Sequence, residues 1–300
     1  MVKWISQRSS EPSLGVRIPP GAQSNYWCHS RSYMPDDILE KTVKIVQKAG
    51  DKVISFYKSA DLVVLEKSPD NPLSEADIAC DSFLKTELLH IFPSAGWLSE
   101  ETIDSFERLD KEFVWIVDPI DGTKEFVLGV PEFSISVGLV QNGETILGVV
   151  YNPATKELYY AGKNTPVYCV GVEIQTTNIA VTLHDAKVDA SNSEIMRGEF
   201  EQFAGYVGKI SAVGSIAYKL ARLSAGSSDA TWSREPKSYW DICAGVHLIK
   251  QSDAIIKDLD GNDFLFNTKK VLVNGLIASR KDLYSEVFDM LLPHRTSARR

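Results

Sequence analysis

A short apolar run that ends in two acidic residues constrains the fold of this chain more than any other feature of its sequence. Residues 113–117 are all apolar, and the residues that follow read Asp118-Pro119-Ile120-Asp121-Gly122-Thr123. Such a run between turn signals predicts a buried strand. Proline cannot donate to a strand ladder and glycine adopts backbone angles closed to other residues, so we expect pairing to end at Pro119 and the chain to bend near Gly122.

The same segment predicts chemistry as well as structure. If a helix begins after the bend, the amides of Gly122 and Thr123 point outward at its N-terminus, where anions bind readily. The carboxylates of Asp118 and Asp121 would lie beside a phosphate placed there. Two anions in contact repel each other, and Mg²⁺ held by one or two carboxylates plus substrate oxygens is the common solution. The segment therefore predicts metal-assisted phosphate chemistry.

Three other interpretations of this segment compete with that one. Asp-Gly alone can make a turn at a strand end. The spacing also resembles the Asp-x-Asp-Gly-Thr nucleophile loop of haloacid dehalogenase-like phosphatases, but it is one residue longer, which would move the first carboxylate out of the attacking position. An EF-hand loop fails because neither Asp118 nor Asp258 is followed by Gly at the sixth loop position or Glu at the twelfth.

The rest of the chain predicts an antiparallel first half and an alternating second half. Apolar spacing indicates helices over residues 38–56 and after Ser74, with residues 69–72 as a loop before the second. Asn142-Gly143 predicts a tight hairpin between strands at 133–140 and 145–151. Further strands are expected at 158–161, 167–170, 187–191, 209–213, 230–232, 254–256 and 271–273, with helices at 216–225 and 240–250. Two packed sheets layered with helices follow from this pattern.

Composition excludes several classes of partner. Against 40 acidic residues stand 32 basic ones, a net charge of −8, which argues against a nucleic-acid partner. No apolar stretch approaches the roughly 18 residues of a membrane span, so no membrane association is expected. The four cysteines form no CxxC pair and have no zinc spacing, which favours a reduced, cytoplasmic location.

Residues 1–33 differ from the rest of the chain. They hold four basic residues against one acid, with seven serines and three prolines, and they lack the apolar core of a secretory signal. A transit peptide and a start codon assigned too early both fit, and we favour the second, with Met34 as the functional start. The expected organisation is a leader at 1–33, an N-terminal metal-binding half at 34–178 and a C-terminal half at 179–300.

Several separated motifs share their order with one family. They are KSPDNPLSEAD at 67–77, LSEE at 98–101, DPIDGTKEF at 118–126, GSIAYK at 214–219 and WDICAG at 240–245. In this order they resemble the inositol monophosphatase superfamily over most of residues 35–280. Within it, Lys124-Glu125-Phe126 resembles the 3′(2′),5′-bisphosphate nucleotidase branch.

The resemblance implies an α+β fold, a layered αβαβα sandwich, and Li⁺-sensitive, Mg²⁺-dependent hydrolysis of a small phosphorylated substrate. It implies that two or three Mg²⁺ ions are held by Glu100, Asp118, Asp121, Asp241 and the carbonyl of Ile120. Asp77 would bind through water or a weaker third ion, Thr123 and Glu100 would orient the attacking water, and the amides of Gly122 and Thr123 would receive the phosphate. Ser215, Lys219 and Arg234 are the further expected substrate contacts. A homodimer is compatible with the resemblance.

Arg234 bears on the choice of substrate. It stands seven positions before Asp241, where inositol monophosphatases place an acid, and an arginine there favours a second phosphate. Glu235 is adjacent, so a one-residue shift could restore the acid. We expect removal of the 3′-phosphate of adenosine 3′,5′-bisphosphate, and of its sulfated relative. Inositol monophosphatase or fructose-1,6-bisphosphatase activity is the enzymatic alternative, and a metal-dependent sensor of phosphate ligands is the non-enzymatic one.

Overall fold

The apolar run at 113–117 lies inside strand β4 (Phe113–Asp121), which is buried on both faces. The computed structural model describes residues 37–68, 71–174 and 181–294. Residues Ser32–Arg300 form one unit by their contacts, and the leader expected at 1–33, with Met34, lies outside the described residues.

β4 belongs to a seven-stranded sheet in the order β3-β4-β5-β6-β7-β8-β9. β3 runs parallel to β4, and every other neighbouring pair is antiparallel. The bounds of the six other strands are Gly96–Ser99 (β3), Ser134–Gln141 (β5), Glu144–Asn152 (β6), Glu157–Gly162 (β7), Tyr168–Cys169 (β8) and Val172–Glu173 (β9). The expected hairpin between β5 and β6 is confirmed, because Asn142 and Gly143 both take the positive φ that its two-residue turn requires.

The pairing of β4 does not end at Pro119, contrary to the expectation from the sequence. Asp118 pairs with Ser136 and Asp121 pairs with Ser134, so β4 carries one extra residue between these two pairs. This irregularity is a β-bulge, which accommodates the missing donor of proline and bends the strand. Both carboxylates therefore stay on the sheet, on either side of the bulge.

Helices cover both faces of this sheet. α1 (Ile38–Phe56) and α2 (Glu75–Ile91) pack on one face, and α5 (Ile216–Ser224) and α6 (Tyr239–Lys250) pack on the other. α6 approaches the strands through two glycines: a Cβ at Gly138 would lie 2.5 Å from Cys243 Sγ, and one at Gly148 would lie 2.5 Å from the carbonyl of Ala244. This close packing fixes the position of α6, whose first turn carries Asp241.

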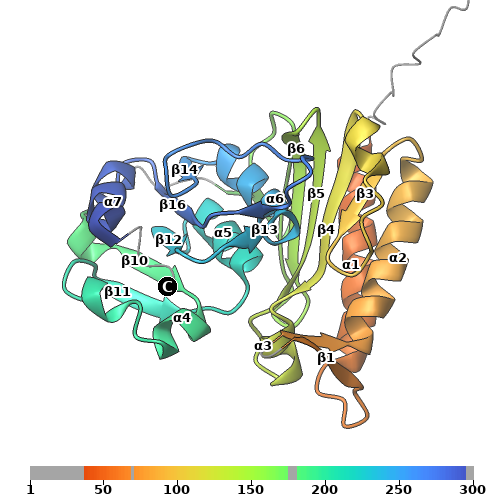
Figure 1. Cartoon of the computed structure of the whole chain (residues 1–300), viewed down its shortest axis with the longest axis horizontal. Coiled ribbons are helices and arrows are strands. Elements are labelled where there is room, and N and C mark those ends of the chain that lie inside the picture. The colour runs from red at the N-terminus through yellow and green to blue at the C-terminus, as the bar shows by residue number, and fades with distance from the viewer. Residues whose placement is uncertain (1–36, 69–70, 175–180, 295–300) are drawn as a thin grey trace, which may run out of the picture. The chain divides into compact units, whose positions relative to one another are not determined.

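A second sheet lies beyond α5 and α6, as Figure 1 shows. Its order is β11-β10-β12-β16-β14, with bounds Lys209–Ala212 (β11), Lys187–Ala190 (β10), Ala230–Ser233 (β12), Leu276–Arg280 (β16) and Ala254–Lys257 (β14). α7 (Tyr284–Leu291) packs with Trp232 and Ile277 in a further core cluster on this sheet. Helix, sheet, helix, sheet and helix thus follow in layers, which confirms the expected αβαβα sandwich.

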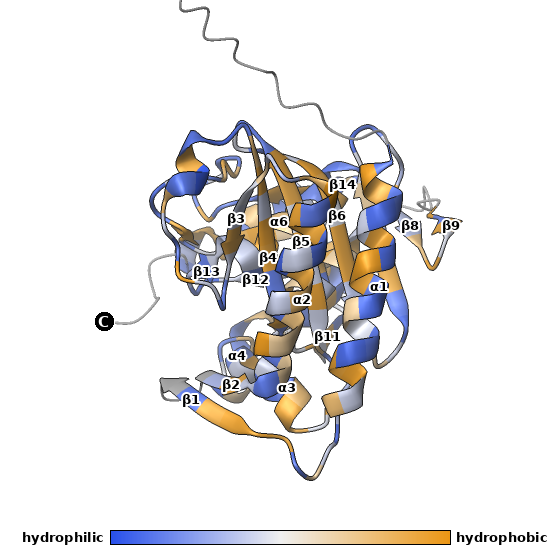
Figure 2. Ribbon diagram, turned by 90° about the vertical axis from the view of Figure 1, so that its right-hand side faces the viewer, coloured by the Kyte–Doolittle hydropathy of each residue, from blue (hydrophilic) through white to orange (hydrophobic). Residues whose placement is uncertain are grey.

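The remaining elements are short. They are β1 (Val64–Ser68), β2 (Asn71–Ser74), α3 (Thr123–Val127), α4 (Asn192–Met196), β13 (Lys237–Ser238), β15 (Leu272–Val273) and 3-10 turns at Glu107–Asp110, Leu183–Asp185, Glu201–Phe203 and Leu292–His294. β1 and β2 form an antiparallel hairpin where the sequence predicted a loop. Figure 2 shows α1 and α2 with polar outer stripes over an apolar sheet. In the described ranges, no helix is long and apolar enough to cross a membrane.

Candidate active site

Three separate elements bring carboxylates together at one edge of the large sheet. Asp118 lies in β4, Glu100 follows β3, and Asp241 lies in the first turn of α6. Because β3 is parallel to β4, with Ser99 opposite Val117, Glu100 emerges beside Asp118. One oxygen from each of the three carboxylates lies within 4.8 Å of the others. Asp118 is 1% exposed, so the cluster reaches from the core to the surface.

The cluster holds an excess of negative charge. Burial raises the pKa of Asp118 well above its usual range, and the neighbouring Glu100 and Asp121 raise it further. Burial, followed by the charge of Asp121, raises the pKa of Asp241 to about 8. Oxygen donors at this spacing suit a hard divalent cation such as Mg²⁺, whose charge would offset the repulsion. The donor set therefore fits the metal that the resemblance implies.

Asp121 lies beside this cluster and is held from the second half of the chain. Its Oδ2 atom accepts hydrogen bonds from the Ser215 hydroxyl at 2.5 Å and from the Ala217 amide at 2.6 Å. Burial raises the pKa of Asp121 to about 6, against the lowering effect of these two hydrogen bonds. Its Oδ1 atom is therefore the carboxylate oxygen left for another ligand.

Asp77 and Thr123 form a second pair of groups at this edge. Asp77 lies in the first turn of α2 and forms a capping box with Ser74: its Oδ2 accepts from the Ser74 amide at 2.8 Å and from the Ser74 hydroxyl at 2.5 Å. The Thr123 hydroxyl lies 3.0 Å from Asp77 Oδ1 and 3.0 Å from the carbonyl of Ile120. A hydroxyl carries one proton, so Thr123 donates to one of these two oxygens at a time.

The bend predicted at Gly122 is confirmed. Gly122 has a φ of +92°, and α3 begins at Thr123 directly after it. A Cβ at Gly122 would also lie 3.0 Å from the carbonyl of Glu132, so this turn requires glycine on two counts. The first amides of a helix have no partner within the helix. Gly122 and Thr123 both line the pocket described next.

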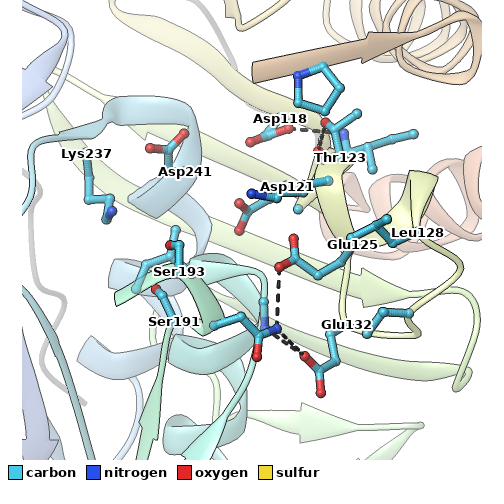
Figure 3. Close-up of a pocket in the computed structure, with 18 of the residues that line it drawn as sticks. Asp118, Asp121, Thr123, Glu125, Leu128, Glu132, Ser191, Ser193, Lys237 and Asp241 are labelled. Carbon is cyan, nitrogen blue, oxygen red and sulfur yellow. Dashed lines mark hydrogen bonds between the residues drawn. The ribbon is translucent and has the colours of Figure 1, made fainter. Parts of the chain in front are cut away.

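A pocket of about 790 Å³ opens over these groups. Both halves of the chain line it, as Figure 3 shows for Asp118 and Glu125 from the first half and Ser191 and Lys237 from the second. The side chain of Lys237 has no hydrogen-bond or ion-pair partner among the described residues, and its charge lowers the pKa of Asp241. The pocket therefore combines a carboxylate cluster with a lysine ammonium.

Ser215, Lys219 and Arg234 do not line this pocket, although the resemblance implies that they contact substrate. Ser215 is buried and bonded to Asp121. Lys219 is 1% exposed, donates to the Ser191 hydroxyl at 2.5 Å, and has its pKa lowered to about 8 by burial. Arg234 donates to Glu199 at 3.3 Å. The geometry thus gives no support to a direct substrate contact from these three side chains.

Other pocket residues carried little signal in the sequence. Glu132 and Asn192 belong to none of the quoted motifs, yet the Asn192 side chain donates to Glu132 at 3.1 Å on the pocket wall. Arg197 also lines the pocket, where it pairs with Glu199 at 2.6 Å and Glu235 at 2.9 Å. Polar residues in a loop or in a helix as short as α4 have no apolar periodicity that would show which way their side chains point, so only the fold could reveal these contacts.

Comparison with known proteins identifies the family. The inositol monophosphatase family matches residues 34–292. A Thermotoga maritima protein named fructose-1,6-bisphosphatase/inositol-1-monophosphatase is 32% identical over 245 residues, which cover 80% of this chain and 93% of that protein. The 3′(2′),5′-bisphosphate nucleotidase CysQ of Salmonella typhimurium is 29% identical over 246 residues, covering 79% and 97%.

A solved structure shows the same fold. The Thermotoga maritima IMPase superposes with a TM-score of 0.76 at 27% identity, covering 86% of this chain and 97% of that one. The family match spans nearly all of the described chain, and the acidic cluster is suited to the metal on which the family depends. The chain therefore belongs to the inositol monophosphatase family of metal-dependent phosphatases, which act on small phosphorylated substrates.

Proposed function

We propose that this chain is a Mg²⁺-dependent phosphate monoester hydrolase that removes the 3′-phosphate of adenosine 3′,5′-bisphosphate. The observation that carries the choice of substrate is Lys237, a pocket cation whose side chain has no hydrogen-bond or ion-pair partner in the part of the chain that the structure describes. A substrate with a second phosphate would supply that partner through a charge-assisted hydrogen bond. The likeness to CysQ, at 29% identity, supports the same substrate class.

We infer that two or three Mg²⁺ ions are held by Glu100, Asp118, Asp241, the free oxygen of Asp121 and the carbonyl of Ile120. Bound there, Mg²⁺ would supply water activation and stabilisation of the charge that develops on the phosphate. The amides of Gly122 and Thr123 receive the phosphate at the start of α3. These assignments follow the carboxylate geometry and the motif order together.

Asp77 and Thr123 orient the attacking water in this proposal. When the Thr123 hydroxyl donates its proton to Asp77 Oδ1, which lies 3.0 Å away, an oxygen lone pair faces away from that bond. This lone pair can accept a hydrogen bond from water and so aim the water oxygen at the phosphorus. Glu100 accepts a second hydrogen bond from the same water. Positioning of this kind accounts for a large part of catalysis, because it removes the entropy cost of bringing the reactants together.

Phosphate release with Mg²⁺, with and without Li⁺, tests the proposal on four substrates. They are adenosine 3′,5′-bisphosphate, adenosine 3′-monophosphate, inositol 1-phosphate and fructose 1,6-bisphosphate. We expect the first to be cleaved with the highest kcat/KM and with sensitivity to Li⁺. Preference for inositol 1-phosphate or fructose 1,6-bisphosphate would replace the nucleotide with the alternative that the Thermotoga maritima relative suggests. Tight binding without release from any substrate would favour the sensor.

The Lys237→Met variant tests the second-phosphate contact. A hydrogen bond to a charged group contributes about 1.5–3 kcal/mol, so kcat/KM for the bisphosphate should fall by about tenfold or more. Adenosine 3′-monophosphate lacks the second phosphate, and its kcat/KM should stay within about twofold. Lys209→Met, on the exposed start of β11, serves as the control. An equal loss for both nucleotides would remove Lys237 from substrate selection.

Two further inferences concern the setting of the enzyme. Cys80, Cys169 and Cys243 carry free thiols, from which we infer a reduced cytoplasmic location. A homodimer stays a prediction, which light scattering coupled to size-exclusion chromatography would test.

A further inference from the structure

Glu132 joins the two halves of the chain beside the carboxylate cluster. It lies between α3 and β5 in the first half. Its carboxylate accepts from the Gly214 amide at 3.1 Å and from the Asn192 side chain at 3.1 Å, and its carbonyl accepts from the Ser215 amide at 3.1 Å. Figure 3 shows its side chain beside that of Glu125 on the pocket wall. One residue thus binds two consecutive amides of the other half.

These two amides belong to Gly214 and Ser215, which immediately precede helix α5. The N-terminal end of α5 donates hydrogen bonds to the Asp121 carboxylate. Ser215 is the N-cap of α5 and donates its hydroxyl to Asp121 Oδ2, and Ala217 in the first turn donates its amide to the same oxygen. The junction is tight, because a Cβ on Gly214 would lie 2.6 Å from the carbonyl of Glu132. The position of the α5 N-terminus therefore depends on Glu132, and the direction of the Asp121 carboxylate depends on the α5 N-terminus.

We infer that Glu132 is a positioning residue for the metal site: by holding Gly214 and Ser215, it fixes the hydrogen bonds that aim the free oxygen of Asp121 at the cation. This inference rests on the proposed function, because it takes Asp121 as a metal ligand. Groups that orient a metal ligand typically change metal affinity by 10- to 100-fold when they are removed. Mg²⁺ affinity is therefore the quantity that Glu132 should control.

Weaker Mg²⁺ binding after substitution of Glu132 could result from lost positioning or from lost charge. Glu132 carries a negative charge near a cation site, so its removal would weaken Mg²⁺ binding by electrostatics alone. Two variants separate the explanations. Glu132→Gln keeps the length of the side chain and an acceptor oxygen but loses the charge. Glu132→Asp keeps the charge but is one methylene too short to reach the Gly214 amide from the same backbone.

Isothermal titration of the metal-free full chain with MgCl₂, without substrate, is the experiment. Positioning predicts that Glu132→Asp binds Mg²⁺ about tenfold more weakly than the wild type and that Glu132→Gln stays within about threefold. The opposite order would show that charge acts and would overturn the inference. Wild-type affinity in Glu132→Asp would also overturn it. Glu144→Asp, an exposed glutamate on β6, is the matched control and should bind as the wild type does.

Gly214→Ala tests the same junction without removing or replacing a carboxylate residue. Its Cβ would displace the carbonyl of Glu132 and the side chain of Glu125, so Mg²⁺ binding should weaken here too, by about tenfold. This variant decides the case if Glu132→Asp does not fold, and unchanged affinity in it would contradict the inference. In steady-state assays, Glu132→Asp and Gly214→Ala should need more Mg²⁺ than the wild type for half-maximal rate. Their kcat should be recovered at saturating Mg²⁺. If the wild type binds no Mg²⁺, both the proposed function and this inference fail. If the wild type binds Mg²⁺ but the variants bind it equally well, only this inference fails.

Discussion

His247 should make the folded protein sensitive to mild acid. Its side chain is 1% exposed on α6, where Nε2 donates to the carbonyl of Gly162 at 3.2 Å and Nδ1 accepts from the Thr145 hydroxyl at 3.3 Å. Both ring nitrogens are therefore used in the neutral form. Burial lowers the pKa of His247 from 6.5 to about 4. Between pH 6.5 and pH 4, His247 is protonated in the unfolded chain but neutral in the folded chain. The free energy of unfolding therefore decreases as the pH falls through this range.

The magnitude follows from the two pKa values of His247. Linkage gives a loss of about 2 kcal/mol at pH 5 and about 3 kcal/mol at pH 4, relative to pH 7.5. His247→Gln removes the titration and keeps one donor and one acceptor, so the stability difference between variant and wild type isolates the contribution of histidine. Urea unfolding at pH 7.5 and pH 5, with Mg²⁺ present, measures this difference. If the difference between the two proteins is the same at both pH values, His247 does not titrate as argued and the reasoning is refuted.

Four further predictions concern the metal site and the packing beside it. Asp121→Asn should lower kcat by about 100-fold or more because it weakens the metal site, with an unchanged circular dichroism spectrum; Asp61→Asn is the exposed control, and near-normal turnover would remove Asp121 from the site. Mg²⁺ at about 100 times its Kd should add about 2.7 kcal/mol of stability. In EDTA the raised pKa of Asp241, about 8, means that ionisation costs stability, so Tm should fall between pH 6.5 and 8.5, and a flat profile would contradict the raised pKa. Gly148→Ala should destabilise by about 1–3 kcal/mol in urea, because its Cβ would lie 2.5 Å from the carbonyl of Ala244, whereas Gly205→Ala, which meets nothing within 4 Å, should be near neutral.

Local signals predicted most of the fold. The Asn142-Gly143 turn, the start of a helix after Ser74 and the apolar run in β4 each depend on interactions within a few residues, and each is confirmed. The β1–β2 hairpin was missed, because Pro72 lies within β2 and proline normally argues against a strand. The bulge at Pro119 was missed for a related reason: a ladder can resume after a proline when the partner strand stays in reach.

The motif order predicted that three carboxylates would converge, and the structure brings them together. Glu100, Asp118 and Asp241 meet as the motif order indicated, because two of them leave neighbouring parallel strands and the third begins a helix packed on the same sheet. For Arg234 and Lys219, the sequence did not show which distant residues their side chains would contact. Glu199, distant in the chain, binds Arg234, and burial beneath Ser191 takes Lys219 out of the pocket.

Because of the bulge in β4, one proposed metal ligand is a main-chain oxygen, which does not depend on the side chain at its position. Ile120 lies in the bulge and is 1% exposed, and its carbonyl, 3.0 Å from the Thr123 hydroxyl, is the oxygen that we propose as a metal ligand. A main-chain oxygen is present whichever residue occupies the position, so substitution at 120 is limited by the core alone. Pro119 and Gly122 shape the backbone here, so replacing either of them would move that oxygen. We therefore expect position 120 to tolerate more substitutions than position 119 or 122.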